Sequence, residues 1–479
     1  MTSPLTLTHI IGADRPGEAA SEIRNPSDTN EVVALAPQGD AATVDAAVQS
    51  AARALPGWSA ASPEVRADIL ERTAQLLFER AEAIGTLLSR EEGKTLKEGI
   101  GETLRAARIF RYFAGEALRR HGLRLDSVRA GVEVETRREA LGVIGLITPW
   151  NFPIAIPAWK AAPALAFGNT VVLKPAGPTP ATAFTLAQVL IEAGLPKGVF
   201  NLVIGRGDVG QAIVDHSAIA AVSFTGSQKV GQGVAEGCAR RLARVQLEMG
   251  GKNPLVVMDD ADLERAVEIA LDGSFMSTGQ RCTASSRLIV CEGVHDAFVE
   301  KLGARVASLR IGHALDPETQ IGPAVSEAQQ ATDYRYIDIA REDGAEVVAG
   351  GERVEAATPG WYVQPTLLAG TRSHQRINQE EVFGPVASVI RVADLDEALS
   401  VANDGEFGLS AGIVTNSLSA ARRFQREIRS GMAMVNLPTA GVDYHVPFGG
   451  TRGSSYGQRE QGFAAVDFYT QVKTAYTLP

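Results

Sequence analysis

The sequence predicts an α/β protein in which helices cover parallel sheets. From Gly142 onward, apolar strand-like runs alternate with helical segments, as in a parallel sheet whose strands are joined by crossover helices. A second round of the same alternation starts at 253–260 (NPLVVMDD). The chain has 479 residues, enough for two large domains or about three of ~150 residues. We therefore expect two α/β domains with a boundary near Gly250-Gly251.

The part of the chain before Gly142 has a different pattern. Residues 41–118 carry apolar residues every three or four positions, which predicts packed helices ending near Gly93 and near His121-Gly122. Residues 124–138 then alternate apolar and polar side chains, which predicts a polar β-hairpin that projects as an arm.

The expected strands share a short apolar run that ends in turn-forming residues. They are 142–149, 170–176, 198–205 and 221–227 in the first domain, and 253–260, 287–293, 411–417 and 431–438 in the second. Helices are expected from Leu263 and from His295.

Composition excludes several classes of protein. Hydrophobic residues make up 45% and charged residues 21%, which is unlike a disordered chain, a coiled coil or a disulfide scaffold. The 46 basic and 56 acidic residues give a net charge of −10 with no Lys/Arg run, so no nucleic-acid partner is expected. The seven histidines are scattered, and we expect no metal site. The GxxxxGK[ST] loop of P-loop NTPases is missing from the sequence.

Cysteine usage predicts a reducing compartment. Cys238, Cys282 and Cys291 are too few for a disulfide framework in a chain of this length. The N-terminus lacks the pattern of a signal peptide. The most apolar stretch, 154–167, is too short to span a bilayer and contains Lys160 and two prolines. We expect a cytoplasmic protein with no membrane partner.

Two glycine-rich turns are candidate nucleotide sites. Gly205–Gly210 (GRGDVG) is a literal G-x-G-x-x-G after a strand, and residues 224–231 (FTGSQKVG) also run from strand through turn to helix. Such turns let a backbone approach a pyrophosphate at a helix N-terminus, but they also join strands to helices in any α/β protein. Two of them on neighbouring strands favour nucleotide binding.

Cys282, in GQRCTA, is the candidate nucleophile. Its neighbours are polar and turn-like, and Arg281 together with a following helix N-terminus would favour the thiolate. Cys291 lies in an apolar strand and Cys238 in a helix, so both are expected in the core, which is also where a lone cysteine usually lies.

Glu248 and Asn151 are the other candidate catalytic residues. Glu248, between Leu and Met before Gly250-Gly251, is expected to have a raised pKa suited to a general base, unless it faces solvent from a strand. Asn151 follows the 142–149 strand, where a side-chain amide can donate to an oxyanion or simply form a turn.

Taken together, these segments resemble the aldehyde dehydrogenase superfamily over essentially the whole chain. Any one motif is weak, but seven in this order are specific. They are TPWNFP (148–153), LKPA (173–176), FTGS (224–227), QLEMGGKNP (246–254), GQRCTA (279–284), EVFGP (381–385) and PFGG (447–450).

The resemblance implies a covalent mechanism. Cys282 would attack the aldehyde to give a thiohemiacetal, and the Asn151 amide with the Cys282 backbone N–H would hold the oxyanion. Hydride transfer would leave a thioester, which water activated by Glu248 would hydrolyse. Lys160 would be a proton relay or a packed structural lysine.

The resemblance also implies the cofactor site. Lys174 would contact the adenosine ribose, Ser227 the pyrophosphate, Glu381 the nicotinamide ribose and Phe383 the nicotinamide, with Gly207 near the adenine. The literal G-x-G-x-x-G would then not be the phosphate cradle. The remaining residues implied for this site are Pro149, Trp150, Thr225 and Gly226.

One departure bears on the cofactor. NAD-preferring members commonly have a Glu where this chain has Gly177, and that carboxylate would bind the ribose 2′-hydroxyl and repel a 2′-phosphate. We expect use of both NAD and NADP. Gln228, in place of a frequent Thr, is expected to be neutral.

The segment 436–462 and the segment 148–176 look like the α-ketoglutarate semialdehyde (2,5-dioxopentanoate) dehydrogenase branch. Arg281 would bind the substrate's carboxylate, or would face away and pair with an acidic neighbour. Phe152, Trp159 and Phe448 would wall the tunnel. Thr451-Arg452 differs from the branch's more frequent Arg-Lys without changing this expectation.

The resemblance implies a Rossmann-like cofactor domain, an α/β catalytic domain and a small β oligomerisation arm. The expected division is 1–121 with 141–250 for cofactor binding, 251–447 for catalysis, 448–466 as a return segment to the cofactor domain, and 122–140 with 467–479 as the arm. An exposed hairpin is marginal alone, so a homodimer or homotetramer is expected.

The expected activity is NAD(P)-dependent oxidation of 2-oxoglutarate semialdehyde. Alternatives are succinate semialdehyde, a broad range of aliphatic or aromatic aldehydes, a CoA-acylating reaction, or a non-catalytic binding protein. The presence of Asn151, Glu248 and Cys282 argues against the last, and Glu248 favours hydrolysis over transfer to CoA.

Overall fold

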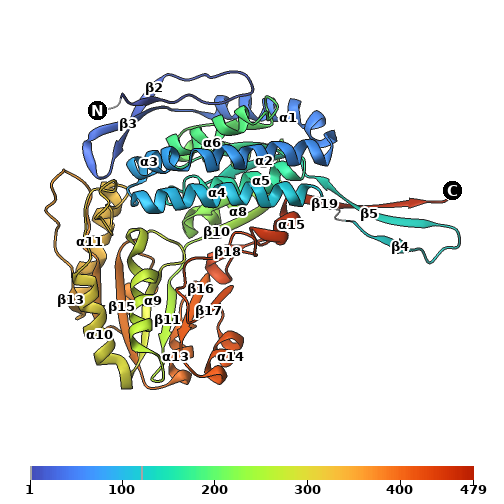
Figure 1. Ribbon diagram of the computed structural model, residues 1–479. Coiled ribbons are helices and arrows are strands. Elements are labelled where there is room, and N and C mark those ends of the chain that lie inside the picture. Colours follow the sequence, from blue (N-terminus) through green and yellow to red (C-terminus); the bar gives the residue numbers. More distant parts are fainter. Residues whose placement is uncertain (1–2, 120–121) are drawn as a thin grey trace.

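The computed structural model describes residues 3–119 and 122–479, so the predicted helix end at His121 lies outside the described residues. Two α/β units lie one above the other, and a narrow arm projects from the upper one (Figure 1). The α/β fold class with parallel strands is confirmed. In the described residues no helix is long and apolar enough to cross a membrane.

Among the described residues, the upper unit contains a six-stranded sheet in the order β18-β10-β9-β6-β7-β8. β18 runs antiparallel to β10, and the other pairs are parallel. The order reverses between β6 and β9, and in open parallel sheets ligands bind at the carboxyl ends of strands beside such a reversal. The strands are β6 (Val143–Ile147), β7 (Thr170–Lys174), β8 (Phe200–Leu202), β9 (Ile219–Gly226), β10 (Arg244–Met249) and β18 (Ser455–Tyr456).

Helices cover both faces of this sheet. Apolar side chains of α1, α7 and α8 pack on one face, and those of α2 to α6 form the larger core on the other. The helices are α1 (Ala41–Ala60), α2 (Pro63–Glu79), α3 (Ala81–Glu92), α4 (Leu96–Ala117), α5 (Ala155–Ala166), α6 (Pro180–Glu192), α7 (Gly207–Asp215) and α8 (Gln228–Arg240).

Local sequence sets the ends of these helices. α3 ends at Gly93, as predicted, where φ is +99°, a value that favours glycine. α4 then begins with a capping box between Thr95 and Glu98.

The lower unit contains a seven-stranded sheet in the order β13-β14-β15-β12-β11-β16-β17, formed within residues 122–479, with β13 antiparallel at one edge. Its strands are β11 (Asn253–Val257), β12 (Ser285–Cys291), β13 (Glu346–Ala349), β14 (Thr366–Ala369), β15 (Val386–Val392), β16 (Ser410–Val414) and β17 (Met432–Val435). Its helices are α9 (Leu263–Phe275), η1 (Met276–Gly279), α10 (Glu292–Ala307), α11 (Glu327–Glu342), α12 (Arg376–Gln379), α13 (Leu395–Ala402) and α14 (Leu418–Glu427).

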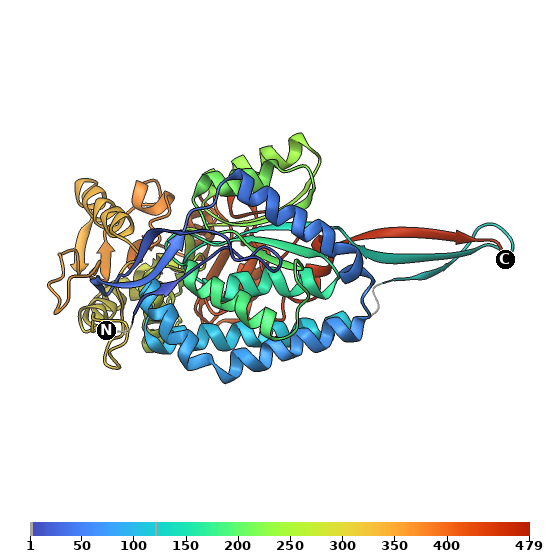
Figure 2. The same cartoon turned by 90° about the horizontal axis from the view of Figure 1, so that it is seen from above.

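The arm combines the predicted hairpin with the C-terminal strand. β4 (Arg124–Asp126) and β5 (Glu133–Ala140) pair antiparallel, and β19 (Thr470–Thr477) lies on the other side of β5. The sequence suggested that this last strand starts near Phe468, but Phe468 lies in α15 (Ala465–Tyr469). Figure 2 shows the arm extending well beyond the two units.

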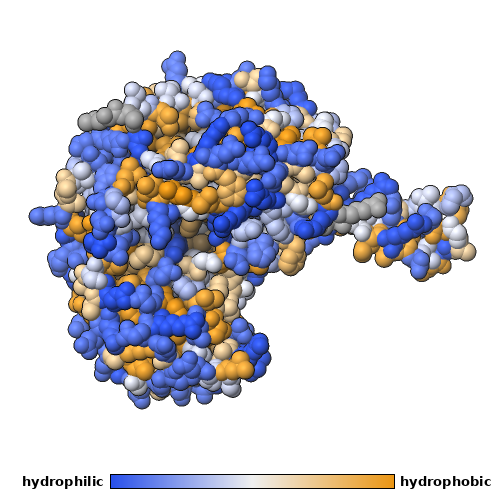
Figure 3. Space-filling view, viewed as in Figure 1, coloured by the Kyte–Doolittle hydropathy of each residue, from blue (hydrophilic) through white to orange (hydrophobic). Residues whose placement is uncertain are grey.

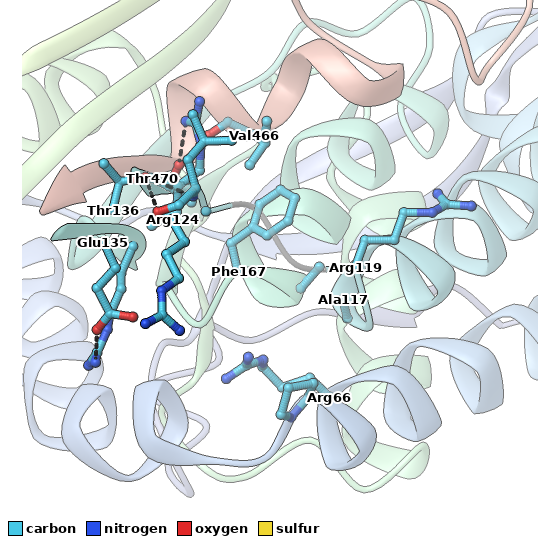
Figure 4. Close-up of a pocket in the computed structure, with 15 residues that line it drawn as sticks. Arg66, Ala117, Arg119, Arg124, Glu135, Thr136, Phe167, Val466 and Thr470 are labelled. Carbon is cyan, nitrogen blue, oxygen red and sulfur yellow. Dashed lines mark hydrogen bonds and ion pairs between the residues drawn. The ribbon is translucent and has the colours of Figure 1, made fainter. Parts of the chain in front are cut away.

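A pocket of about 470 Å³ lies at the base of the arm. Figure 4 looks into it: Arg66 of α2, Phe167 after α5 and Thr136 of β5 surround the same space. The pocket therefore lies between the body of the protein and the arm, and both contribute to its walls.

Two smaller parts complete the described chain. An N-terminal sheet of β1 (Leu5–Thr6), β3 (Asp28–Pro37) and β2 (Ala19–Asn25), in that order, was not predicted from the sequence. The return to the upper unit contains η2 (Arg452–Ser454) and η3 (Gly462–Ala464) on either side of β18.

Candidate active site

The carboxyl ends of β7 and β9 present side chains that have no hydrogen-bond partner among the described residues. Lys174, at the end of β7, is 8% exposed, and its ammonium donates no hydrogen bond to the residues that the structure describes. Burial lowers the pKa of its ammonium. Thr225 Oγ1, at the end of β9, is buried without a partner in the same described set. Buried polar groups normally find partners, so these groups fit a polar ligand.

Two glycine turns lie beside these groups. A Cβ on Gly207 would meet no atom within 4 Å. Ser227 is the N-cap of α8 and its side chain makes no capping hydrogen bond, so the helix N-terminus adjoining Gly226 can receive an anion. This arrangement supports phosphates at the 226–227 turn.

The other end of the predicted cofactor site lies at the junction of the two units. Trp150 and Phe383 meet edge to face, with ring centroids 5.3 Å apart. Glu381 Oε1 accepts a hydrogen bond of 2.9 Å from the Gly251 N–H, and burial raises the pKa of this carboxyl to about 7. A Cβ on Gly250 would lie 2.0 Å from Glu381 Oε2, so the Gly-Gly pair lets the carboxylate approach the backbone.

Cys282 lies in a turn between η1 and β12. The Asn253 amide of β11 donates to the Cys282 carbonyl at 2.8 Å and to the Ala284 carbonyl at 2.9 Å, which fixes the turn to the sheet. On the other side, Ser277 N and Oγ both donate to Glu98 of α4, at 2.7 and 2.9 Å. The turn is therefore held from both units.

The expectation that Arg281 and a following helix N-terminus favour the thiolate of Cys282 is wrong. A turn and strand β12 follow Cys282, not a helix N-terminus. Burial, together with the negative charges of Glu381 and Glu248, raises the pKa of the thiol to about 12. Cys238 and Cys291 are fully buried, as predicted.

The Asn151 side chain reaches the cysteine turn. Its Nδ2 donates to the Gln280 backbone carbonyl at 2.9 Å, and the backbone carbonyl of Asn151 accepts from Lys94 Nζ at 2.7 Å. An amide nitrogen carries two hydrogens, so one remains for a ligand oxygen.

Glu248 is buried in β10, which excludes the solvent-facing alternative. Ser455 Oγ of β18 donates to its Oε2 at 2.6 Å, and Oε1 has no partner among the described residues. Burial and the charge of Glu460 raise the pKa of Glu248 well above its ordinary value, as predicted.

Lys160 is a fully buried residue of α5 that connects to this carboxylate pair. Its ammonium forms an ion pair with Glu460 and donates to Ser223 Oγ at 2.8 Å. The sequence analysis missed Glu460, although this residue lies in the 436–462 segment. Its contact with Lys160 of α5 is formed only in the folded protein.

A cavity of about 240 Å³ opens beside Cys282. Trp159 and Phe448 wall it with ring centroids 5.4 Å apart, and Phe152 lies under the Lys94 ammonium, which is 4.1 Å from its ring centroid. The predicted aromatic wall thus surrounds the candidate nucleophile.

Two arginines also line this cavity. Arg281 turns its guanidinium to the end of α9, where it donates to the carbonyls of Asp272 and, at 3.3 Å, Gly273. Arg105, on α4, was missed by the sequence analysis. The available signal was a basic residue among the apolar positions of an otherwise packed helix.

This fold and site define an aldehyde dehydrogenase: the chain belongs to the aldehyde dehydrogenase family, whose model matches residues 14–475. It is 44% identical to an alpha-ketoglutaric semialdehyde dehydrogenase of Bacillus subtilis, over 96% of this chain and 94% of that one. It is 46% identical to an alpha-ketoglutarate semialdehyde dehydrogenase of Haloferax volcanii, over 95% of each. The crystal structure of a betaine aldehyde dehydrogenase from Staphylococcus aureus in complex with NAD⁺ matches with a TM-score of 0.96. The two chains are 33% identical, and the match covers 99% of this chain and 95% of that one. The protein is therefore an oxidoreductase that acts on aldehydes with NAD(P).

The geometry at Gly279 generates a testable prediction. Gly279 has φ of +63°, and a Cβ there would lie 2.2 Å from the Gly384 carbonyl oxygen, close to Glu381. We expect Gly279→Ala to lower the free energy of unfolding by about 2 kcal/mol or more and to slow the reduction of NAD(P) strongly. The matched control is Gly233→Ala in α8, where a Cβ meets nothing within 4 Å and alanine suits the helix. Thermal unfolding measures the stability of each variant, and NAD(P)H absorbance measures its activity. Wild-type stability and activity in Gly279→Ala would contradict this account.

Proposed function

We propose that the protein oxidises 2-oxoglutarate semialdehyde to 2-oxoglutarate. The observation that carries the proposal is the cavity in which Cys282 shares its walls with two arginines, Arg105 and Arg281. A substrate with a carboxylate beyond its aldehyde needs a cation in such a pocket. Support also comes from the two relatives named for this substrate.

Cys282 is the proposed nucleophile. Its sulfur attacks the aldehyde carbon and the thiol proton passes to the aldehyde oxygen, since the buried site holds the thiol neutral. The oxygen of the thiohemiacetal accepts hydrogen bonds from the Asn151 amide and the Cys282 backbone N–H. When bound, NAD(P) would supply the hydride acceptor. Loss of a hydride from the thiohemiacetal carbon and of the proton from its oxygen would leave a thioester on Cys282.

Glu248 is the proposed general base. With its raised pKa it can take a proton from the water that attacks the thioester, which releases the carboxylate and restores the thiol. Lys160 and Glu460 lie behind it as the proposed route for that proton, through the ion pair that links them.

The cofactor residues are proposed from the same contacts. Lys174, Gly207, Thr225, Gly226 and Ser227 would hold the adenosine and phosphates; Pro149, Trp150, Glu381 and Phe383 would hold the nicotinamide end. We propose that NAD and NADP are both used. Gly177 offers no carboxylate against a 2′-phosphate, and Arg206 lines the same cavity of about 340 Å³ as Gly177.

We infer that the arm forms a homodimer or homotetramer. Apolar side chains are exposed along it (Figure 3): Leu125 is 48%, Val128 103%, Val472 59% and Tyr476 61% exposed. Exposed apolar residues on a narrow ribbon with open strand edges suit pairing with a second copy. The three unpaired thiols suit a cytoplasmic location.

The proposed function is tested by kcat/KM with several aldehydes. With either cofactor, kcat/KM should be higher for 2-oxoglutarate semialdehyde than for succinate semialdehyde, propanal or benzaldehyde. The product should be the free acid whether or not CoA is present. Cys282→Ala should abolish turnover and keep cofactor binding. A flat profile would overturn the substrate assignment, and an acyl-CoA product would overturn hydrolysis.

The role of Glu248 predicts a change in the slow step. Glu248→Gln keeps the size of the side chain and removes the base, so a burst of NAD(P)H about equal to the enzyme concentration should precede turnover that is at least ~100-fold slower. Stopped-flow absorbance measures both phases. Slow turnover without a burst would place Glu248 before hydride transfer.

The open space at Gly177 predicts a change in cofactor choice. A Cβ there meets nothing within 4 Å, so Gly177→Glu can be accommodated. Its charge should lower kcat/KM for NADP at least ~10-fold and spare NAD. Gly177→Gln, without the charge, should keep NADP use. An unchanged NADP/NAD ratio in the Glu variant would contradict the expected site for the ribose.

A further inference from the structure

Arg105 has hydrogen-bond donors to spare inside the cavity that contains Cys282. It projects from the middle of α4 and is partly buried. The only hydrogen bond of its side chain among the described residues is a long one of 3.5 Å from Nη2 to Gln461 Oε1, and within that set the guanidinium forms no ion pair. A guanidinium carries five N–H donors, and leaving them unpaired in a partly dry cavity is costly.

The other cations around this cavity already have partners. Lys94 Nζ pairs with Glu102 at 2.8 Å and donates to the Asn151 carbonyl. Arg281 is bound to the backbone carbonyls of Asp272 and Gly273, and its Nη1 is 3.9 Å from Asp272 Oδ1. Neither can turn to a ligand without giving up these contacts.

The anionic groups near Arg105 leave it available as well. Glu102 influences it electrostatically, but the Glu102 carboxylate is occupied by Lys94 and by the backbone N–H groups of Ile154 and Ala155. Asp443 also acts on Arg105 through its charge, but it is exposed on the loop beside Val442. The thiol of Cys282 belongs to the same electrostatic surroundings, so Arg105 and the nucleophile face one cavity.

We propose that Arg105 binds the carboxylate of the substrate and so selects aldehydes that carry an acid group away from the reacting carbon. The planar guanidinium can accept a carboxylate in two parallel hydrogen bonds while the aldehyde lies at Cys282. This inference rests on the proposed function and names the residue that confers its specificity. Arg281 then adds positive charge to the wall and holds the end of α9.

The test compares Arg105→Leu with Arg105→Lys and with Arg108→Leu. Arg108 is the matched control: it lies one turn further along α4 and is exposed. Each variant is assayed with 2-oxoglutarate semialdehyde and with pentanal, which has the same chain length and no acid group.

Arg105→Leu should lower kcat/KM for the semialdehyde about 30-fold or more, mainly through KM, and change pentanal less than about threefold. Arg105→Lys should recover to within about tenfold of wild type, because it keeps the charge and loses the bidentate geometry. Arg108→Leu should match wild type with both substrates. An equal loss on both substrates, or no loss on the semialdehyde, would overturn the proposal.

A binding measurement separates this inference from the proposed function. Glutarate, an unreactive dicarboxylate, should protect Cys282 of the wild-type enzyme from iodoacetamide and should not protect the Arg105→Leu variant. If the wild type prefers pentanal, the proposed substrate fails, and glutarate protection still decides whether Arg105 binds a carboxylate. If Arg105→Leu does not fold, Arg105→Lys decides by the same two readouts, and undiminished protection and wild-type selectivity in it would overturn the bidentate contact.

Discussion

The burial of polar groups at the junction between the two α/β units governs the chemistry of this site. Burial is the largest cause of the raised pKa of Cys282, Glu248 and Glu381. Each group is thereby held nearer its neutral form before substrate arrives. In such surroundings, a hydrogen bond to a developing oxyanion and a single guanidinium facing a carboxylate both act more strongly than they would in water.

The site depends on contacts that cross between the units. Glu98 of α4 holds Ser277 beside the cysteine turn, and Asn151 after β6 donates to Gln280 in it. Consecutive left-handed residues, Ser277 with φ of 55° and Thr278 with φ of 55°, lead into that turn. Non-glycine residues hold this conformation only where surrounding contacts enforce it, so the position of Cys282 reflects the packing of both units.

The sequence predicted the parts of the fold whose pattern is local. Strands β6, β7, β11 and β12 are largely buried apolar runs and were predicted, whereas the similarly buried β14 and β15 were missed. The N-terminal sheet was missed because β2 is largely exposed and carries no apolar run. The start of β19 was placed too early because the short helix α15 lies directly before it.

Site residues were found where a motif surrounds them, and missed where the fold alone assembles them. Cys282, Glu248 and Asn151 lie in recognisable segments. The ionisation of Cys282 was mispredicted, because its burial and its proximity to Glu381 cannot be read from neighbouring residues. Glu460 and Arg105 join the site through contacts with residues 300 and 356 positions away, respectively.

The most direct test of this account is the pH dependence of Cys282 alkylation by iodoacetamide in the cofactor-free enzyme. Mass spectrometry would locate the label, since Cys238 and Cys291 are fully buried. Because a thiol with a pKa raised to about 12 is almost wholly protonated near neutrality, the rate should still be rising above pH 9. A rate that levels off below pH 8 would show that the thiolate is already formed near neutrality and would contradict the account.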